Sequence, residues 1–293
     1  MAHVDCHCHI AAPEFNEDVD EVIKEAKKVG IQALVGVTEH FGEFSRMLEL
    51  SERYPRFVYP CLGVHPVQGS EGKLRSADPL DLQDALAVIE ENQHKLLAIG
   101  EVGLDFTPHV ADSEEKRNQQ RDVLCQQLEL AKRLNLPVNV HSRSAGRPTI
   151  QLLKDQGADR VLLHAFDGRV SVAMEGIRAG YFFSVPPSVV RSEQKQKLVK
   201  QLPIEHLLLE TDAPALGPEK QVPQKRLNRS QRNFGFVCPC FNPTRMNKSS
   251  NLASYFKVLA FCSTSLHCPF SCLQLLSCLT TISCIRHYLL IIN

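Results

Sequence analysis

Short apolar runs alternate with longer amphipathic segments along the first 212 residues of the chain. The runs are almost continuously apolar, which is typical of strands that are buried on both faces of a parallel sheet. They predict eight strands, at Ala2–Asp5, Ala33–Thr38, Phe57–Val64, Leu96–Gly100, Pro137–Val140, Arg160–His164, Tyr181–Val185 and His206–Leu209.

The segments between these runs repeat apolar residues at the spacing of a helix. In the longest segment, Val123, Leu124, Leu128 and Ala131 fall on one helical face. The pattern predicts seven helices, at Glu17–Val29, Phe44–Arg53, Leu80–Asn92, Lys116–Leu134, Thr149–Gln156, Val170–Ala179 and Ser192–Gln201.

Strands that alternate with helices indicate a parallel sheet, because every parallel connection needs a crossover. A closed (β/α)₈ barrel, the TIM barrel of the α/β class, accommodates eight such strands. A doubly wound open sheet is the alternative. No glycine-rich phosphate loop follows the first predicted strand, which argues against the dinucleotide-binding form of that sheet. We therefore expect a barrel.

Histidines and acids occur just after most of the predicted strands. In a barrel, the carboxyl ends of all strands surround one mouth, where catalytic residues gather. We therefore expect one site that contains His7, His9, His65, Glu101, Asp105, His141, His164, Glu210 and Asp212.

The start of the chain carries the densest part of this pattern. Alternation along a strand places Asp5, His7 and His9 on one face, with the two histidines roughly 7 Å apart. The same alternation turns Cys6 and Cys8 to the opposite face and excludes them as ligands. Asp5 either orients a ligand by hydrogen bonding or fills the barrel interior as a buried polar group.

Imidazole and carboxylate groups together suit zinc, manganese or iron, and carboxylate-rich sites also accept magnesium. A bridging carboxylate holds two ions about 3.5–4 Å apart, the arrangement used in phosphoryl and amide hydrolysis. Glu101 is the expected bridge, and Asp212 is placed to bind one ion and to accept a proton from water. The sequence therefore predicts two divalent metal ions.

Two further residues are candidates for substrate binding. His65 would contact a substrate phosphate or assist proton transfer, and an orienting role behind a metal ligand is the alternative. Arg143 would pair with phosphate, and a surface salt bridge is its alternative.

Charge and cysteine are distributed unevenly. Residues 222–293 hold eight Lys or Arg and no acid, so residues 1–221 carry 25 basic against 33 acidic residues. A net charge of −8 argues against a broad basic face that grips nucleic acid.

Four of the eleven cysteines lie in this first part, where no signal peptide is evident. We expect free thiols and an intracellular location, nuclear or cytoplasmic.

Six motifs resemble those of the TatD family of metal-dependent deoxyribonucleases: Asp5-Cys6-His7-Cys8-His9, Gly63-Val64-His65-Pro66, Gly100-Glu101-Val102-Gly103-Leu104-Asp105, Val140-His141-Ser142-Arg143, Leu163-His164-Ala165-Phe166-Asp167-Gly168 and Leu209-Glu210-Thr211-Asp212-Ala213-Pro214. The resemblance covers about residues 1–220 in consistent order. It implies a barrel hydrolase that acts on DNA phosphodiesters as an exonuclease, with possible action at abasic sites.

The same resemblance implies a division of the metal ligands. His7, His9 and Glu101 would hold one ion, with Asp212 on that ion beside the attacking water. Glu101, His141 and His164 would hold the second ion. DNA is the partner that the resemblance implies, and it implies no protein partner.

The end of the chain departs from this family. We expect a hydrolase domain at 1–220 and a divergent, poorly ordered tail at 221–293 in place of the last helix. Residues 258–285 lack charge, so a membrane anchor is the less favoured alternative for the tail. Loss of the last helix would lower stability and activity relative to a chain with the usual ending.

Two alternative functions stay open. The chain is either a barrel hydrolase of small esters or amides, or an inactive variant.

Overall fold

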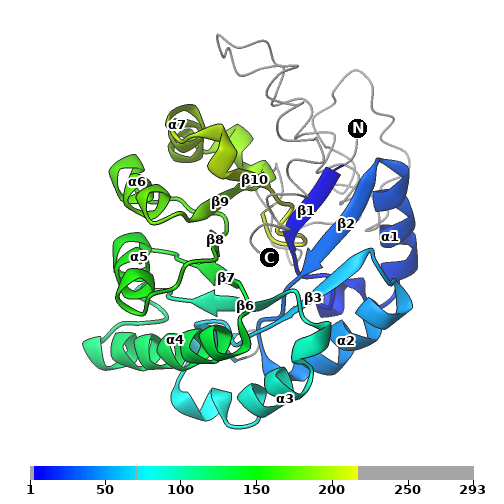
Figure 1. The fold of residues 1–293 in the computed structure, drawn as a ribbon, viewed down its shortest axis with the longest axis horizontal. Coiled ribbons are helices and arrows are strands. Elements are labelled where there is room, and N and C mark those ends of the chain that lie inside the picture. The colour runs from blue at the N-terminus through cyan, green and yellow to red at the C-terminus, as the bar shows by residue number, and fades with distance from the viewer. Residues whose placement is uncertain (1–2, 70–71, 217–293) are drawn as a thin grey trace.

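The computed structural model describes residues 3–69 and 72–216. Eight parallel strands form one sheet that curls into a nearly closed barrel, and the helices surround it (Figure 1). The strand order follows the chain without a reversal, which excludes the doubly wound alternative. The strands are β1 (His3–Cys8), β2 (Ile31–Gly36), β3 (Val58–Leu62), β6 (Ala98–Gly103), β7 (Val138–His141), β8 (Val161–Leu163), β9 (Phe182–Val185) and β10 (Leu207–Leu209).

Each of the seven predicted helices is present within the described residues, with ends that differ by a few positions. The largest shift is at the third helix, where the 3-10 helix Pro79–Leu82 takes up the start of the predicted segment. The helices are α1 (Val19–Lys28), α2 (Phe44–Arg53), α3 (Ala85–Glu91), α4 (Glu114–Leu134), α5 (Gly146–Asp155), α6 (Val170–Arg178) and α7 (Glu193–Gln201).

One small element was not predicted. The loop after β3 folds into an antiparallel hairpin of β4 (Val67–Gln68) and β5 (Arg75–Ser76). Strands of two residues are too short to give a recognisable hydrophobic period, so the pattern could not reveal them.

The barrel closes where β1 approaches β10. The Asp212 N–H donates to the His7 carbonyl at 3.0 Å, and the His9 N–H donates to the Ala213 carbonyl at 3.0 Å. Buried Asp5 accepts hydrogen bonds from the backbone and the hydroxyl of Thr211, at 2.9 and 2.5 Å. These bonds join the first and last strands at the mouth. Asp5 is thus a buried polar group of the closure.

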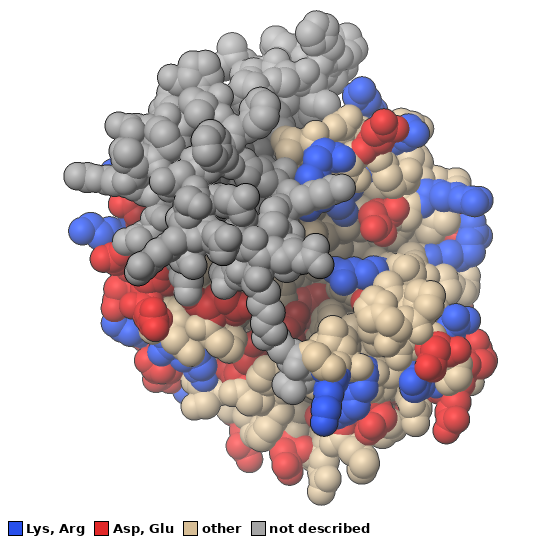
Figure 2. Space-filling model, turned by 180° about the vertical axis from the view of Figure 1, so that it is seen from behind, with Lys and Arg blue, Asp and Glu red and all other residues tan. Residues whose placement is uncertain are grey.

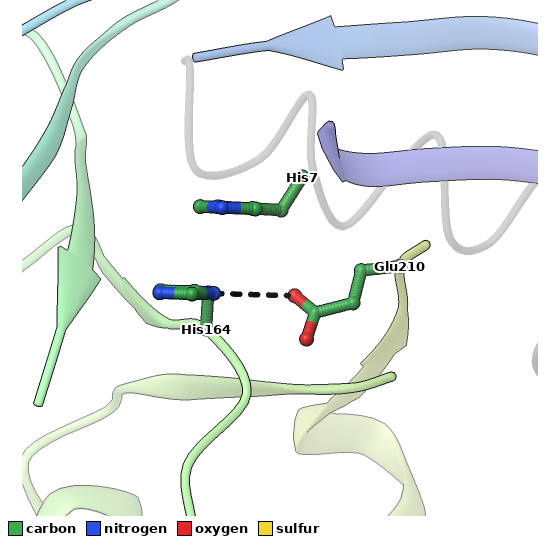
Figure 3. Close-up of side chains that lie close together, drawn as sticks. All are labelled: His7, His164 and Glu210. Atoms are coloured by element: carbon green, nitrogen blue, oxygen red, sulfur yellow. Dashed lines mark ion pairs between the residues drawn. The ribbon is translucent and has the colours of Figure 1, made fainter. Parts of the chain in front are cut away.

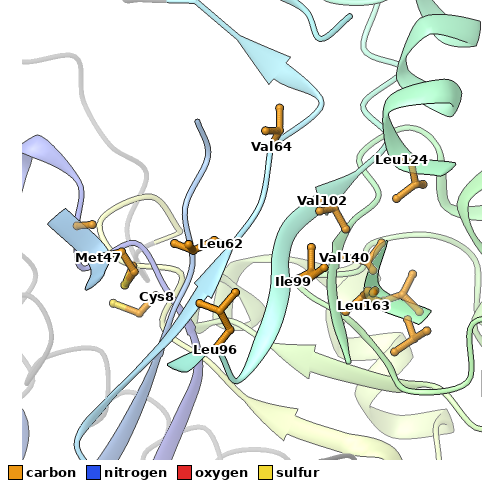
Figure 4. Packing of buried hydrophobic residues seen from close by; sticks show 14 of the residues in the cluster. Cys8, Met47, Leu62, Val64, Leu96, Ile99, Val102, Leu124, Val140 and Leu163 are labelled. Atoms are coloured by element: carbon orange, nitrogen blue, oxygen red, sulfur yellow. The ribbon is translucent and has the colours of Figure 1, made fainter. Parts of the chain in front are cut away.

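Two hydrophobic clusters pack against the strands of the barrel, one on the outer side and one inside. The larger lies between strands and helices and includes Cys8, Leu62, Ile99, Val102 and Leu124 (Figure 4). The smaller draws its residues from six strands, as expected for the barrel interior: Cys6, Val35, Val37, Cys61, Ala98, Leu162 and Leu208.

The expectation that Cys6 and Cys8 share one face is therefore wrong. Cys6 packs in the interior cluster, whereas Cys8 packs in the outer one. The register of β1 against β2 shifts between Asp5 and Cys8, which breaks the strict alternation. The shift also explains why β1 runs on to Cys8, three residues past its predicted end.

Gly103, the last residue of β6, sits against β7 so closely that no side chain fits. Its φ is +147°, and a Cβ there would lie 2.1 Å from the His141 carbonyl oxygen. Gly103→Ala is therefore expected to destabilise the protein by about 3 kcal/mol, through both strain and overlap. Gly180→Ala is the matched control, because Gly180 also has positive φ but open space around it. Chemical denaturation measures both. Equal losses for the two variants would contradict the role of close packing at Gly103.

No helix among residues 3–69 and 72–216 combines the length and apolar character that a membrane crossing needs. The predicted tail at 221–293, its possible anchor and the effect of a missing last helix lie outside the described residues. The boundary at residue 220 stays a prediction.

Candidate metal centre at the barrel mouth

The structure brings seven of the predicted strand-end residues into one buried cluster. The predicted substrate-binding residue Arg143 lies in a loop and is not part of this cluster. His7 belongs to β1, Glu101 to β6 and His141 to β7, while the others follow their strands by one to three residues. Each of the seven is less than 9% exposed, although histidines and acids are usually found at the surface. The members are His7, His9, His65, Glu101, His141, His164 and Asp212.

Four ligand atoms converge in one half of the cluster. The Nε2 atoms of His7 and His9 lie 3.2 Å apart. Glu101 Oε2 lies 3.4 Å from His7 Nε2 and 3.5 Å from His9 Nε2. Asp212 Oδ1 lies 3.1 Å from His9 Nε2 and 3.5 Å from His7 Nε2. Two imidazoles and two carboxylates thus face one point.

The other oxygen of Glu101 faces a second group. Glu101 Oε1 lies 2.9 Å from His141 Nδ1, 2.7 Å from His164 Nε2 and 3.4 Å from His65 Nε2. His141 Nδ1 and His164 Nε2 lie 3.2 Å apart. One carboxylate therefore divides its two oxygens between two sets of histidines.

Asn139, two residues before His141 on β7, fixes the tautomer of His7. The Asn139 amide nitrogen donates to the Cys6 carbonyl at 3.1 Å, which leaves its oxygen to accept from His7 Nδ1 at 2.8 Å. The neutral His7 ring then presents a lone pair from Nε2 to the cluster. Asn139 was not identified from the sequence, although a residue two positions before His141 lies on the same face of a strand and was therefore a candidate.

Asp105 orients His141 in the same manner. Its Oδ2 lies 3.2 Å from His141 Nε2, and its Oδ1 accepts from the backbone and hydroxyl of Thr107. His141 then turns the lone pair of Nδ1 toward Glu101. Acids that hold the far nitrogen of a metal-ligating histidine are a common feature of metal sites.

A third carboxylate lies behind His164. Figure 3 shows the rings of His7 and His164 stacked, with Glu210 approaching His164. The ring centroids are 3.8 Å apart, and Glu210 Oε2 lies 3.9 Å from His164 Nδ1, which is beyond hydrogen-bond distance. Glu210 instead accepts from the Ser184 hydroxyl and from the Ala165 N–H at 2.9 Å. Sequence reasoning placed Glu210 at the mouth together with Asp212 but assigned it no role.

The residues present fit divalent cations. Three groups have ligand atoms mutually close enough to hold an ion: His7–His9–Glu101, His65–Glu101–His141 and His7–His164–Glu210. His9 Nδ1 and His164 Nδ1 are buried without a hydrogen-bond partner among the described residues. Nitrogen and carboxylate donors at such density are the set that zinc, manganese and iron prefer.

The charges in the cluster depend strongly on each other. Burial alone would raise the pKa of Glu101, but the surrounding histidines hold it well below its usual range. Burial opposes protonation of His9, yet Asp212 and Glu101 raise its pKa to about 9. Burial dominates at His164 and lowers its pKa to about 3. Without a cation, the first half of the cluster therefore holds a proton where an ion would bind.

The two predicted substrate-binding residues lie differently. His65 Nδ1 lies 3.1 Å from the Val67 nitrogen and 3.2 Å from the Val67 carbonyl oxygen, and its Nε2 points to Glu101. Arg143 is exposed in the loop after β7. Burial would lower the pKa of His141, but Asp105 and Glu101 raise it, and the nearby charge of Arg143 opposes that rise. Arg143 makes no ion pair with any residue inside the described ranges, so the surface salt bridge is not seen there.

Comparison with known proteins gives consistent matches. The family described as TatD related DNase matches residues 4–260, past the boundary expected at 220. The human protein named Deoxyribonuclease TATDN3 is 64% identical over 228 residues, which cover 78% of this chain and 83% of the human protein. The Bacillus subtilis protein named Uncharacterized metal-dependent hydrolase YabD is 34% identical, over 73% of this chain and 81% of its own.

Solved structures show the same fold. The crystal structure of YJJV, the TatD homolog from Escherichia coli K12, has a TM-score of 0.69 and 28% sequence identity, and covers 96% of each chain. A TatD family hydrolase from Entamoeba histolytica has a TM-score of 0.68 and 24% identity, over 89% of this chain and 90% of its own.

Proposed function

Because this chain belongs to the TatD family of DNases, we propose that it is a metal-dependent hydrolase that cleaves phosphodiester bonds of DNA. The single observation that supports a two-ion site is the division of the Glu101 oxygens between two sets of histidines. One ion would be held by His7, His9, Glu101 and Asp212, and the other by Glu101, His141 and His164.

Zinc, manganese or magnesium would meet the requirements of these ligands. When bound, two such ions lower the pKa of water and offset the negative charge of the phosphate that is attacked. Burial would raise the pKa of Asp212, but hydrogen bonds from His7 and His9 hold it well below its usual range. Asp212 is therefore ionised and able to accept the proton of the attacking water.

His65 and Arg143 would bind the substrate. His65 Nε2 points into the cluster, where in the tautomer that carries the hydrogen on Nε2 it would donate to a phosphate oxygen. The exposed guanidinium of Arg143 suits the paired oxygens of a phosphate. Figure 2 shows basic and acidic side chains interspersed over the visible face, which favours such local cations over a broad basic surface.

We infer exonuclease action, with cleavage at abasic sites as a second activity, from the family alone. Cys8, Cys61 and Cys125 are free thiols, which favours a reducing compartment, nuclear or cytoplasmic. The assay that tests this function offers metal-loaded protein linear DNA, DNA with one abasic site, small esters and amides. Release of nucleotides from DNA is expected. Turnover of small esters or amides without cleavage of any DNA would support the alternative barrel hydrolase. No turnover of any substrate would indicate an inactive chain.

Arg143→Ala is expected to raise KM for DNA about tenfold and to leave kcat nearly unchanged, because the residue binds phosphate without entering the cluster. Steady-state kinetics on DNA and on a small aryl phosphodiester measure the effect, which should be confined to DNA. Arg178→Ala is the matched control, since Arg178 is at the far end of α6 from the strand ends. An unchanged KM for Arg143→Ala would remove Arg143 from the substrate site.

A further inference from the structure

Lys195 is a buried lysine next to the metal centre for which the proposed reaction has no use. It lies in the first turn of α7, where its N–H donates to the hydroxyl of Ser192 at 3.3 Å. The residue is only 9% exposed, although lysines are rarely buried without a partner. A desolvated ammonium costs free energy, so its surroundings should show what it interacts with.

The ammonium donates to the carbonyl of Ala165, the residue that directly follows His164. Ala165 has a φ of +45°, a left-handed conformation that a residue with a Cβ seldom adopts. Its N–H donates to Glu210 Oε1 at 2.9 Å. The N–H and the carbonyl of Ala165 are therefore both held by buried ionisable side chains.

The neighbouring residue of α7 holds the other end of the same loop. Gln194 Nε2 donates to the Gly168 carbonyl at 2.7 Å. Between the two bonds, Phe166 is buried and packs edge-on against Phe183 at 5.2 Å. The first turn of α7 thus fixes residues 165–168 at both ends.

His7 and His141 have a partner that orients the ring, whereas His164, like His9, has none among the described residues. His7 has Asn139 and His141 has Asp105 as partner for the far ring nitrogen. His164 Nδ1 has no hydrogen-bond partner within the described residues. Its direction toward Glu101 must therefore come from ring stacking on His7 and from the backbone that Lys195 holds.

Charge adds a second reason for a lysine at this position. Burial lowers the pKa of Lys195, and the carboxylates of Asp167, Glu210 and Asp212 oppose that shift. A cation here offsets the negative charges of Asp167 and Asp212. A neutral donor would supply the hydrogen bond without that offset.

We propose that Lys195 is a positioning residue that fixes the Ala165 turn and thereby directs His164 to the second metal ion. The inference rests on the proposed two-ion function. Loss of an outer hydrogen-bonding partner typically weakens metal binding 10–100-fold. The loss should fall on the ion held by His141 and His164, while the ion held by His7 and His9 keeps its affinity.

The test is a titration of metal-free full-length protein with Zn²⁺ and, separately, with Mn²⁺, for the wild type and five variants. Lys195→Met should weaken the second ion about 10–100-fold and leave the first unchanged. Lys195→Arg should restore most of the affinity, because it keeps a cationic donor. Gln194→Ala should weaken the same ion several-fold and covers the case in which Lys195→Met does not fold.

Two controls on α7 separate positioning from general damage. Lys197→Met removes an exposed lysine, and Leu198→Ala destabilises the helix through a buried side chain. Both should retain both affinities. Unchanged binding by Lys195→Met and Gln194→Ala would overturn the role of Lys195. A wild type that binds fewer than two ions of either metal would overturn the two-ion function itself.

Discussion

Glu101→Gln is expected to reduce DNA cleavage by about 10³-fold or more while the protein stays folded. The substitution keeps the size of the side chain but removes the charge whose two oxygens face the two histidine groups. A glutamine amide offers one acceptor oxygen and one NH₂ group that only donates, so it cannot present an acceptor to both groups. We therefore expect the variant to lose at least one bound ion as well as activity.

Glu43→Gln is the matched control for this variant. Glu43 is also a buried acid, and its carboxylate accepts from the Glu39 N–H at 2.7 Å, outside the cluster. It should retain near-normal cleavage and metal content. Retention of more than a tenth of the activity by Glu101→Gln would contradict the bridging role.

Metal removal is expected to produce the second large effect. At an ion concentration of 100 times Kd, each bound ion stabilises a folded protein by about 2.7 kcal/mol. For a domain of this size that corresponds to a fall in Tm of roughly 5–10 °C per ion on chelation. Cleavage of DNA should disappear with the ions and return when they are added back.

This stabilisation should grow as the pH rises from about 6.5 to 9. The pKa of His9 is about 9 in the metal-free protein, because Asp212 and Glu101 outweigh its burial. Its proton stabilises the metal-free fold below the usual histidine pKa of about 6.5, and that stabilisation is lost as pH rises through 9. The same proton competes with the ion, so metal affinity increases over the same interval.

Thermal melts with and without metal at several pH values measure the difference. His206→Gln is the control, since His206 bonds to the Tyr181 carbonyl away from the cluster. A metal-induced rise in Tm that stays constant or falls between pH 6.5 and 9 would contradict the competition.

Much of the fold was predictable because the strands and helices of a parallel α/β fold are recognisable from local hydrophobic patterns. Runs such as the one that becomes β8 are apolar on both faces, and the helices between them repeat with a helical period. Closure of the barrel was harder to predict from the sequence. It depends on bonds such as that from the Asp212 N–H to the His7 carbonyl, between residues that are more than 200 positions apart.

Two strands were predicted to end too early, at positions where the regular pleat is interrupted next to the site. β1 and β6 both continue past their predicted ends, and both show a register shift at that point. Alternation alone therefore placed Cys6 on the wrong face. The polar residues that end an apolar run in the sequence are in fact part of the strand that carries them.

The grouping of the ligand residues followed from one geometric rule, that parallel strands end at the same mouth. The same rule placed Asp105 at the mouth, but the roles of the residues that orient the ligands did not follow from it. Asn139 and Asp105 act through hydrogen bonds across neighbouring strands, and Lys195 acts through a carbonyl of another loop. Such contacts depend on side-chain directions that spacing along the chain does not specify.

The central claim is that a carboxylate at residue 101 joins two ions into one hydrolytic site. The most direct measurement titrates metal into metal-free protein while nucleotide release from DNA is recorded. Activity that rises only as the second equivalent binds is the predicted result. Full activity at one equivalent per chain, or cleavage of DNA without metal, would contradict the claim.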